Sequence, residues 1–228
     1  NKLWQVSVAG LDGPSLSADE RELILKSPPA GIILFSRNVT GLSQLTLLTS
    51  ELRRLAPGLL IMADHEGGII SVLADAAGVP PSQLAVGSLE DPVSRAEVYR
   101  ETAGRLKSCG INTLLGPVAD VNTEIFNPVI GTRAFPGPAS EVCGLVAEAV
   151  GYYREEGVIT CLKHFPGHGC TTADSHLYLP EVPQLSSRPG QEALAPFAAG
   201  IERGTDMVMT GHLRTSDSAL PVSMDGEV

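Results

Sequence analysis

The sequence has few aromatic residues and few charged ones. Aromatic side chains make up 4 % of the 228 residues and charged side chains 18 %, whereas apolar residues make up 43 %. This composition supports a sizeable packed core and argues against an intrinsically disordered chain. No apolar run reaches the length of about 18 residues that a membrane helix needs, so we expect no contact with a membrane.

Clusters of basic residues and closely spaced cysteine pairs are also missing. The net charge is −10, and no lysine- or arginine-rich stretch is present, so we expect no nucleic-acid partner. None of the cysteines forms a C-x-x-C pair; they are Cys109, Cys143, Cys161 and Cys170. Three fall in predicted helices or strands and resemble buried free thiols, and only Cys170 lies in a polar loop. A reduced, cytoplasmic setting is the simpler interpretation, although a signal peptide already removed before Asn1 would leave no trace.

Short β-branched apolar runs alternate with longer stretches of helical periodicity. Strands are predicted at 5–10, 31–37, 59–68, 112–121, 158–167 and 205–213. Helices are predicted at 18–27, 41–56, 91–110, 138–157 and 190–204, the last interrupted or started late by Pro196. We therefore expect a parallel sheet covered by helices, in a single domain over residues 1–228.

Both a doubly wound sheet and a (β/α) barrel fit this alternation. Polar residues stand toward the carboxyl ends of four of the predicted strands, at Asp64, Asp120, Lys163 and His212. In a barrel, functional residues gather at the carboxyl ends of many successive strands, whereas in an open sheet they concentrate near one switch point. The distribution favours the barrel.

The segment KHFPGHGCTTADSH (163–176) holds three of the five histidines. Asp174 and His176 lie two residues apart, and a carboxylate beside an imidazole can orient the ring as a general acid/base. The alternative is that Asp174 caps a turn and His176 is a solvated loop residue. A metal site built from His164, His168, His176 and Asp174 is another alternative, but the spacing matches no metal-binding helix motif.

This segment resembles the K-H-F-P-G-H-G-x-T-x-x-D-S-H signature of family 3 glycoside hydrolases, in the β-N-acetylglucosaminidase branch. The resemblance continues, in the same order along the chain, at ADHEGG (63–68), GPVADVN (116–122), NPVIGTRAF (127–135) and MVMTGHL (207–213). It implies a TIM-type (β/α)8 barrel and a retaining hydrolase that removes terminal non-reducing β-linked N-acetylglucosamine. The implied partner is a small carbohydrate, used in cell-wall recycling, and no metal or organic cofactor is required.

The resemblance also implies roles for six residues. His176 is the general acid/base and Asp174 its partner, while Asp64, Arg133, Lys163 and His164 hold the terminal sugar. An ordinary histidine titrates near pH 6.5, roughly, so it can donate and accept a proton around neutrality. A histidine in place of a second carboxylate also avoids repelling an anionic acceptor, which leaves phosphate open as a second acceptor besides water. From the residues alone, Arg133 in a surface ion pair and Glu66 as a turn cap remain alternatives.

The chain departs from the family pattern at its end and at three internal positions. The family's nucleophilic aspartate after the seventh strand has no counterpart, and neither Asp217 nor Asp225 follows an apolar strand. We therefore leave the nucleophile unassigned and expect a barrel that is incomplete at its C-terminus. A sugar-binding remnant without hydrolase activity, or a β-glucosidase-type specificity, are the alternatives. His65, Ile69 and Cys170 stand where relatives usually carry Gln, Arg and Asp, and the change at Ile69 bears on the sugar pocket.

Overall fold

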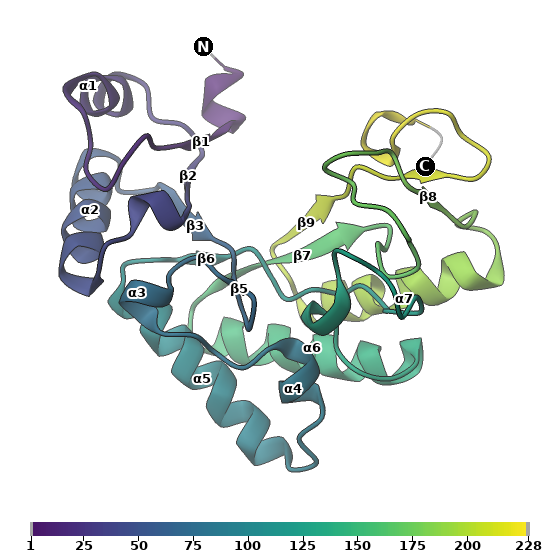
Figure 1. Cartoon of the computed structure of the whole chain (residues 1–228). Helices are drawn as coiled ribbons and strands as arrows, with labels where there is room; N and C mark the ends of the chain where they lie inside the picture. The colour runs from purple at the N-terminus through teal and green to yellow at the C-terminus, as the bar shows by residue number, and fades with distance from the viewer. Residues whose placement is uncertain (1, 227–228) are drawn as a thin grey trace.

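A curved parallel sheet forms the centre of the molecule. The computed structural model describes residues 2–226, where six strands pair in the order β1-β2-β3-β6-β7-β9, each parallel to its neighbours. They are β1 (Val8–Gly10), β2 (Gly31–Leu34), β3 (Leu60–Ala63), β6 (Thr113–Leu114), β7 (Ile159–Phe165) and β9 (Met207–Thr210). The sheet curls like half of a barrel, with β1 and β9 at its two ends (Figure 1). The predicted parallel α/β architecture is confirmed.

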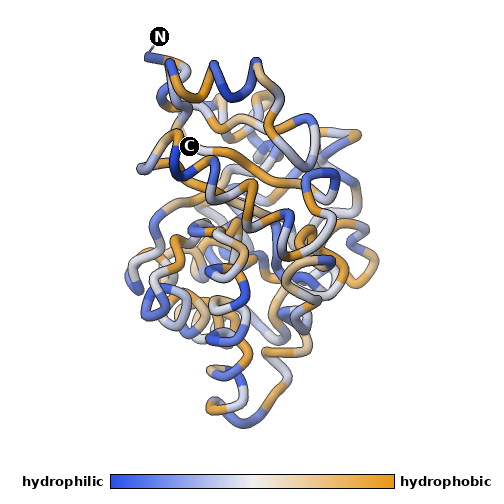
Figure 2. Tube along the Cα trace, turned by 90° about the vertical axis from the view of Figure 1, so that its left-hand side faces the viewer, coloured by the Kyte–Doolittle hydropathy of each residue, from blue (hydrophilic) through white to orange (hydrophobic). Residues whose placement is uncertain are grey.

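Five long helices alternate with these strands in the described residues and lie on one side of the sheet (Figure 1). They are α1 (Ala18–Lys26), α2 (Leu42–Leu55), α5 (Pro92–Ser108), α6 (Ala139–Glu155) and α7 (Arg188–Arg203). Along the helices the trace alternates between hydrophilic and hydrophobic residues, as expected for elements with one face on a core (Figure 2). Within residues 2–226, no helix combines the length and apolar character required to cross a bilayer.

The ends of the helices follow from local sequence. Ser17 caps α1 through a capping box, because its Oγ accepts from the Glu20 N–H at 3.2 Å while the Glu20 carboxylate accepts from the Ser17 N–H at 2.7 Å. After α5 and α6 the chain turns at Gly110 and Gly157, which have φ of +76° and +73°. Only glycine adopts this conformation readily, so these two glycines end the helices.

The prediction that Pro196 interrupts or delays the last helix is wrong. Helix α7 begins at Arg188, capped by Ser187, and continues through Pro196 to Arg203. The missing N–H of a proline weakens a helix locally, but here the surrounding turn is held by packing. Pro196 and Phe197 are buried, and Gly200 lets α7 approach Val146 and Leu162 closely.

The predicted strand over 59–68 is in fact two elements. Strand β3 ends at Ala63, and the chain then forms an antiparallel hairpin of β4 (His65–Gly67) and β5 (Ile70–Ser71). Gly67 and Gly68 allow the reversal, with φ of +99° and +56°. The remaining short elements are α3 (Ala74–Ala77), α4 (Gln83–Gly87) and the parallel pair β8 (Glu181–Val182) and β10 (Arg214–Thr215).

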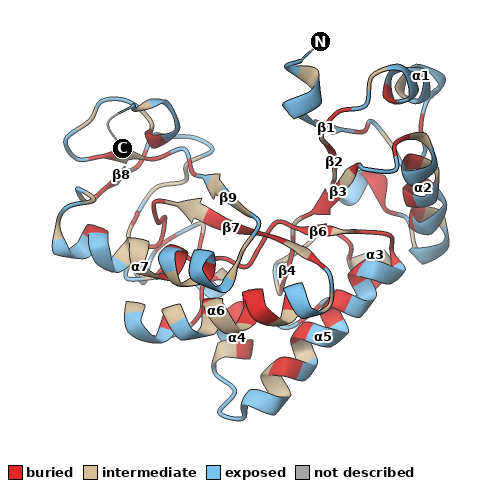
Figure 3. Ribbon diagram, turned by 180° about the vertical axis from the view of Figure 1, so that it is seen from behind, coloured by how far each residue is buried: buried red, intermediate tan, exposed pale blue. Residues whose placement is uncertain are grey.

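Successive residues of the strands face opposite sides of the sheet. Ile32 and Leu34 belong to the large core beneath the helices, whereas Ile33 between them belongs to a small second cluster. We call this second group the inner-face cluster; it consists of Ile33, Leu60, Met62, Leu115, Cys161, Met207 and Met209. Buried residues are concentrated in β3, β6 and β7, whereas the C-terminal loops are mostly exposed (Figure 3). The concave side of the half-barrel is therefore also apolar.

Candidate active site

The polar residues that follow the strands meet in one cleft of about 570 Å³. The loops after β3, β6, β7 and β9 all contribute to its lining. Its polar lining residues are Asp64, Glu66, Arg133, Lys163, His164, His168, Ser175, His176, Thr210 and His212. All four predicted sugar-holding residues and the predicted acid/base His176 thus border the same space.

Lys163 joins two carboxylates at the floor of the cleft. Its Nζ lies 2.5 Å from Asp64 Oδ1 and 2.5 Å from Glu66 Oε1. The Lys163 and Glu66 side chains are almost completely buried, while about a quarter of the Asp64 side chain is exposed. Burial alone would raise the pKa of Glu66, but hydrogen bonds from Arg133 and the charge of Lys163 hold it below its ordinary value. Glu66 is therefore an ionised anchor, and Asp64 is the carboxylate that faces the cleft.

Arg133 holds the other side of Glu66. Its Nε and Nη2 donate to the two carboxylate oxygens, each at 2.8 Å, and its side chain is only 10 % exposed. This is the fork-to-fork geometry of a strong ion pair. The pair spans 67 residues of sequence. The alternatives of a surface ion pair for Arg133 and a turn cap for Glu66 are both wrong.

Asp120 fixes the ring of His164. It is fully buried and lies 2.7 Å from His164 Nδ1, and it also accepts from the backbone N–H of His164 and of His168. Burial would raise the pKa of Asp120, but its hydrogen bonds with the His164 ring and with the N–H groups of His164 and His168 keep it lowered. Since Nδ1 donates to Asp120, Nε2 is left to accept from Arg133 Nη2 at 3.2 Å. Asp120 thus orients the His164 ring, and the ring in turn contacts Arg133.

Asp174 and His176 form the predicted pair on the rim of the cleft. Oδ1 of Asp174 accepts from both the backbone N–H and the ring Nδ1 of His176, each at 2.8 Å. These bonds lower the pKa of Asp174. The arrangement directs Nε2 of His176 away from Asp174 and makes it the atom that can exchange a proton. The His176 side chain is 81 % exposed, so in this state the pair is open to solvent.

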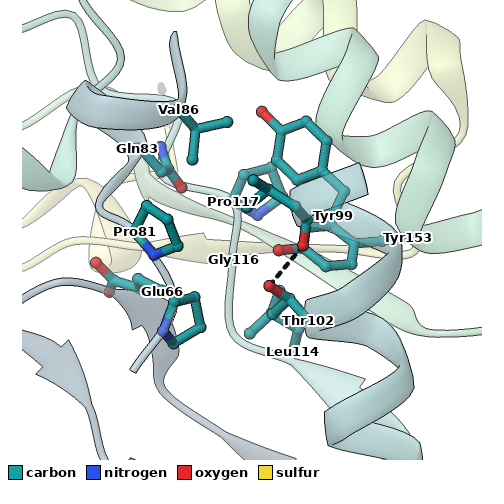
Figure 4. A pocket seen from close by; sticks show the side chains of 12 residues that line it. Glu66, Pro81, Gln83, Val86, Tyr99, Thr102, Leu114, Gly116, Pro117 and Tyr153 are labelled. Carbon is teal, nitrogen blue, oxygen red and sulfur yellow. Dashed lines mark hydrogen bonds between the residues drawn. The ribbon is translucent and has the colours of Figure 1, made fainter. Parts of the chain in front are cut away.

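A smaller cavity lies behind Glu66, away from the cleft. Its volume of about 10 Å³ is enough for one water molecule, and it is enclosed by Pro81, Gln83, Tyr99 and Tyr153 among others (Figure 4). The Gln83 amide clamps the backbone of Val118, accepting from its N–H at 2.8 Å and donating to its carbonyl at 2.9 Å. This cavity is too small for a sugar, and it belongs to the wall that supports Glu66.

The side chains of the histidine-rich loop are paired with carboxylates and a hydroxyl. Across residues 2–226, no three or more His, Cys, Asp or Glu side chains are grouped so that they could hold a metal ion. All four cysteines are free thiols, and Cys143 and Cys170 are only half-buried. The metal-site alternative for the loop histidines therefore finds no support in the arrangement of these residues.

Sequence reasoning missed two residues that organise the site. Glu66 contacts both Lys163 and Arg133, and Asp120 contacts His164 and the His168 backbone. Both had a visible signal, since each is a carboxylate near the carboxyl end of a predicted strand. Ile69 is 74 % exposed and does not line the cleft, whereas its neighbours Ile70 and Val72 do.

The chain is similar to proteins of one family along nearly its whole length. A family described as "Glycosyl hydrolase family 3 N terminal domain" matches residues 1–224. A beta-hexosaminidase of Methylococcus capsulatus is 37 % identical over 209 residues, which cover 89 % of this chain and 61 % of that protein. A beta-hexosaminidase of Neisseria meningitidis is 35 % identical over 206 residues, covering 87 % and 57 %. The chain thus spans about three-fifths of the length of these curated relatives.

Solved structures give the same result. A glycoside hydrolase family 3 beta-N-acetylglucosaminidase from Paenibacillus superposes with a TM-score of 0.89 and 38 % identity, covering 96 % of this chain and 43 % of that one. NagZ from Neisseria gonorrhoeae, in complex with N-trifluoroacetyl-D-glucosamine, superposes with a TM-score of 0.87 and 31 % identity, covering 95 % and 66 %. The half-barrel and its loops are therefore an arrangement that these enzymes share.

Proposed function

This chain belongs to glycosyl hydrolase family 3, and from that premise we propose that the whole protein is a retaining glycosidase that removes terminal non-reducing β-linked N-acetylglucosamine. The observation that carries the proposal is the Asp174–His176 pair on the rim of a cleft whose floor is built from Asp64, Lys163 and Arg133. The beta-hexosaminidase and beta-N-acetylglucosaminidase names of the relatives support this substrate class.

The floor of the cleft suits a single polyhydroxylated ring. Asp64 offers carboxylate oxygens as acceptors, while Lys163 and Arg133 offer donors that are already held in place by Glu66. His164 adds a ring whose orientation Asp120 fixes. A sugar hydroxyl both donates and accepts hydrogen bonds, so fixed acceptors beside fixed donors can bind it with little rearrangement. We assign Asp64, Arg133, Lys163 and His164 to the terminal sugar.

The acid/base step falls to His176. In the first half-reaction its Nε2 protonates the oxygen of the leaving group, and in the second half-reaction it takes a proton from the attacking water. Asp174 orients the ring and stabilises its charged form, because its own lowered pKa keeps it ionised at neutral pH. Retaining enzymes usually use a second carboxylic acid here. A histidine serves the same purpose near neutrality.

We leave the nucleophile outside residues 1–228. Asp217 and Asp225 border a different depression from the cleft, beside Leu185 and Thr215. The curated relatives are longer than this chain, and we propose that the whole protein contributes the nucleophile from a further strand. Such strands would pair with the outer edges of β1 and β9, cover the inner-face cluster and complete a (β/α)8 barrel.

A binding protein without hydrolase activity is the second candidate, because no carboxylate in the described residues is nominated as nucleophile. The experiment that separates the two is an intact-mass measurement of the purified protein followed by assays with 4-nitrophenyl N-acetyl-β-glucosaminide, β-glucoside and β-xyloside. We expect a mass well above 23.9 kDa and cleavage of the first substrate. Sugar binding without turnover would favour the binding protein, and preferred cleavage of the glucoside would favour the other specificity.

Two finer parts of the proposal have their own tests. We propose water as the acceptor of the glycosyl group, and an assay in phosphate buffer that yields glycosyl phosphate would replace it by phosphate. We also propose that the protein acts in the cytoplasm on fragments of the cell wall. Fractionation of the source cells with an antibody against the chain tests the compartment, and a periplasmic or secreted protein would contradict it.

A further inference from the structure

His168 has a buried ring atom without a partner, at the edge of the cleft. The residue is 1 % exposed, and its Nε2 has no hydrogen-bond partner among residues 2–226. His168 nevertheless borders the same cleft as Ser175 and His176. Because buried polar atoms are nearly always paired, an orphaned one beside a cleft indicates a partner that arrives in another state of the site.

The neighbours of His168 determine which ring nitrogen carries the proton. The carbonyl oxygen of His168 already accepts from Asn127 Nδ2 at 2.8 Å and from the Thr171 N–H at 3.3 Å, which uses both of its lone pairs. Thr171 Oγ1 lies 3.1 Å from this carbonyl oxygen and 2.7 Å from His168 Nδ1. Because both carbonyl lone pairs are used, we assign the single hydroxyl hydrogen of Thr171 to the nearer acceptor, Nδ1. With Nδ1 accepting, the hydrogen is on Nε2. The orphaned atom is therefore an N–H donor that lacks an acceptor.

An acceptor is available on the same loop. Asp174 uses one carboxylate oxygen, Oδ1, for both bonds to His176, and in the described part of the chain no hydrogen bond reaches its Oδ2. The bonds from His176 lower the pKa of Asp174, which keeps this carboxylate ionised. His168 lines the same cleft as Ser175 and His176, the two residues that follow Asp174. An ionised oxygen without a donor and a buried donor without an acceptor thus belong to the same side of the cleft.

The exposure of His176 shows why the two groups are apart in this state. With 81 % of its side chain exposed, His176 lies on the rim, and it must move inward to reach the oxygen between two sugars. Asp174 is bonded to the His176 ring and moves with it. A sugar hydroxyl is the other acceptor to consider, but Nε2 is buried, which favours an acceptor supplied by the protein's own loop over one from a ligand in the open cleft.

We propose that His168 is a positioning residue for the acid/base pair. Its Nε2–H donates a hydrogen bond to Oδ2 of Asp174 when the segment that carries Asp174 and His176 moves over the bound sugar, while His168 itself stays held by Asp120 and Asn127. This bond holds Asp174, and through it His176, at the leaving oxygen. The inference rests on the proposed function, because it gives His168 a part in the protonation of the leaving group.

The test compares two substrates that share the terminal sugar but differ in whether the leaving group needs that proton. The whole purified protein is assayed at pH 7 with 2,4-dinitrophenyl N-acetyl-β-glucosaminide, whose leaving group departs without a proton, and with chitobiose, whose leaving group requires one. His168→Phe keeps a buried ring but removes the donor. We expect it to lower kcat/KM on chitobiose roughly 10- to 100-fold, within the range that general acid catalysis contributes. The dinitrophenyl substrate should lose less than about 3-fold, since its departure does not use His176 as an acid.

Two further variants separate positioning from structure. His168→Gln keeps an N–H donor near the same place and should recover most of the chitobiose activity. His65→Gln is the matched control, because His65 is also completely buried with both ring nitrogens unpartnered but does not border the cleft. It should leave both substrates unchanged. Combining His168→Phe with Asp174→Asn should cost no more than Asp174→Asn alone, because both act through one interaction.

The outcomes are distinguishable. A wild-type protein that cleaves neither substrate contradicts the proposed function. A wild-type protein that cleaves both, with equal losses for His168→Phe on the two substrates or additive losses with Asp174→Asn, overturns the inference. A rise in KM alone would identify a direct contact to the sugar and overturns it as well. If His168→Phe does not fold, ¹⁵N spectra of the histidine rings decide: the Nε2 signal of His168 must shift when N-acetylglucosamine is added, and an unchanged signal overturns the inference.

Discussion

Both oxygens of the Glu66 carboxylate accept hydrogen bonds from one guanidinium, that of Arg133, at 2.8 Å each. The relationship matters because Lys163 bonds the same carboxylate at 2.5 Å, so one buried anion holds two cations in the cleft. Removing the charge at Glu66 leaves two cations beside the single carboxylate of Asp64.

Glu66→Gln should therefore damage both stability and activity. Breaking a buried pair costs about 3–5 kcal/mol, and misplacing Arg133 and Lys163 by about 1 Å should lower kcat/KM about 100-fold. Urea unfolding and the 4-nitrophenyl assay measure the two effects. Glu148→Gln is the control, since Glu148 pairs with Arg95 at 2.9 Å through the same two-pronged contact, between α5 and α6. That variant should retain full activity; equal activity losses in the two variants would show that Glu66 has no special part in the cleft.

Asp174→Asn and His176→Ala should affect turnover without affecting folding. The His176 side chain is 81 % exposed and the Asp174 side chain 38 %, and their bonds are to each other, so we expect the melting temperature to stay within about 2 °C of the wild type. The loss of acid/base assistance should lower kcat roughly 10²- to 10⁴-fold on substrates that need protonation. Glu155→Gln, at the exposed Arg203–Glu155 pair, supplies a control for a surface charge. Full turnover by His176→Ala would remove His176 from the mechanism.

His65 should make the protein less stable in mild acid. Burial, with a contribution from the charge of Arg105, lowers the pKa of His65 to about 4 from the ordinary 6.5. Between these values the unfolded chain binds a proton that the folded chain does not, so stability falls as the pH drops from 6.5 toward 4, by roughly 3 kcal/mol in total. Urea unfolding at pH 7 and pH 5 measures this slope. His65→Gln cannot titrate and should show a flatter one; identical slopes in the two proteins would contradict the prediction.

Gly169→Ala should dislodge the loop that carries the acid/base pair. A Cβ at this position would lie 2.0 Å from the Val121 carbonyl oxygen, and the Gly169 carbonyl itself accepts from the N–H groups of Thr123 and Glu124. We expect a loss of about 2 kcal/mol or more in the free energy of unfolding, and at least a tenfold loss of activity. Gly144→Ala, in α6 where a Cβ meets nothing within 4 Å, should instead stabilise by about 0.5–1 kcal/mol. Both values come from urea unfolding, and equal effects of the two substitutions would contradict the packing argument.

The regular elements were predictable because their signals are local. Ser17 and Glu20 form a capping box that can be seen in four consecutive residues, and Gly110 and Gly157 end helices by their own conformational freedom. The prediction at Pro196 failed because tertiary packing outweighed the local tendency of proline to end a helix. The buried turn around Phe197 and Gly200 stabilises α7 on both sides of the proline.

The sequence predicted which residues line the candidate site but not which of them contact one another. The resemblance placed Arg133, Lys163 and His164 at a sugar, yet nothing within a short window of sequence shows that Glu66 joins the first two. That contact spans 67 residues and depends on the reversal at Gly67 and Gly68, which the strand prediction overlooked. Interactions of this kind become visible only when the curl of the sheet brings the loops together.

The inner-face cluster has a chemical consequence. Four of its seven side chains contain sulfur, and they include three of the four methionines in the chain: Met62, Met207 and Met209. Thioethers fill irregular space well, but peroxide converts them into polar sulfoxides. Oxidative stress would therefore place new polar groups on the concave side of the sheet, directly beneath the cleft, while the core under the helices contains no methionine to be oxidised among the described residues.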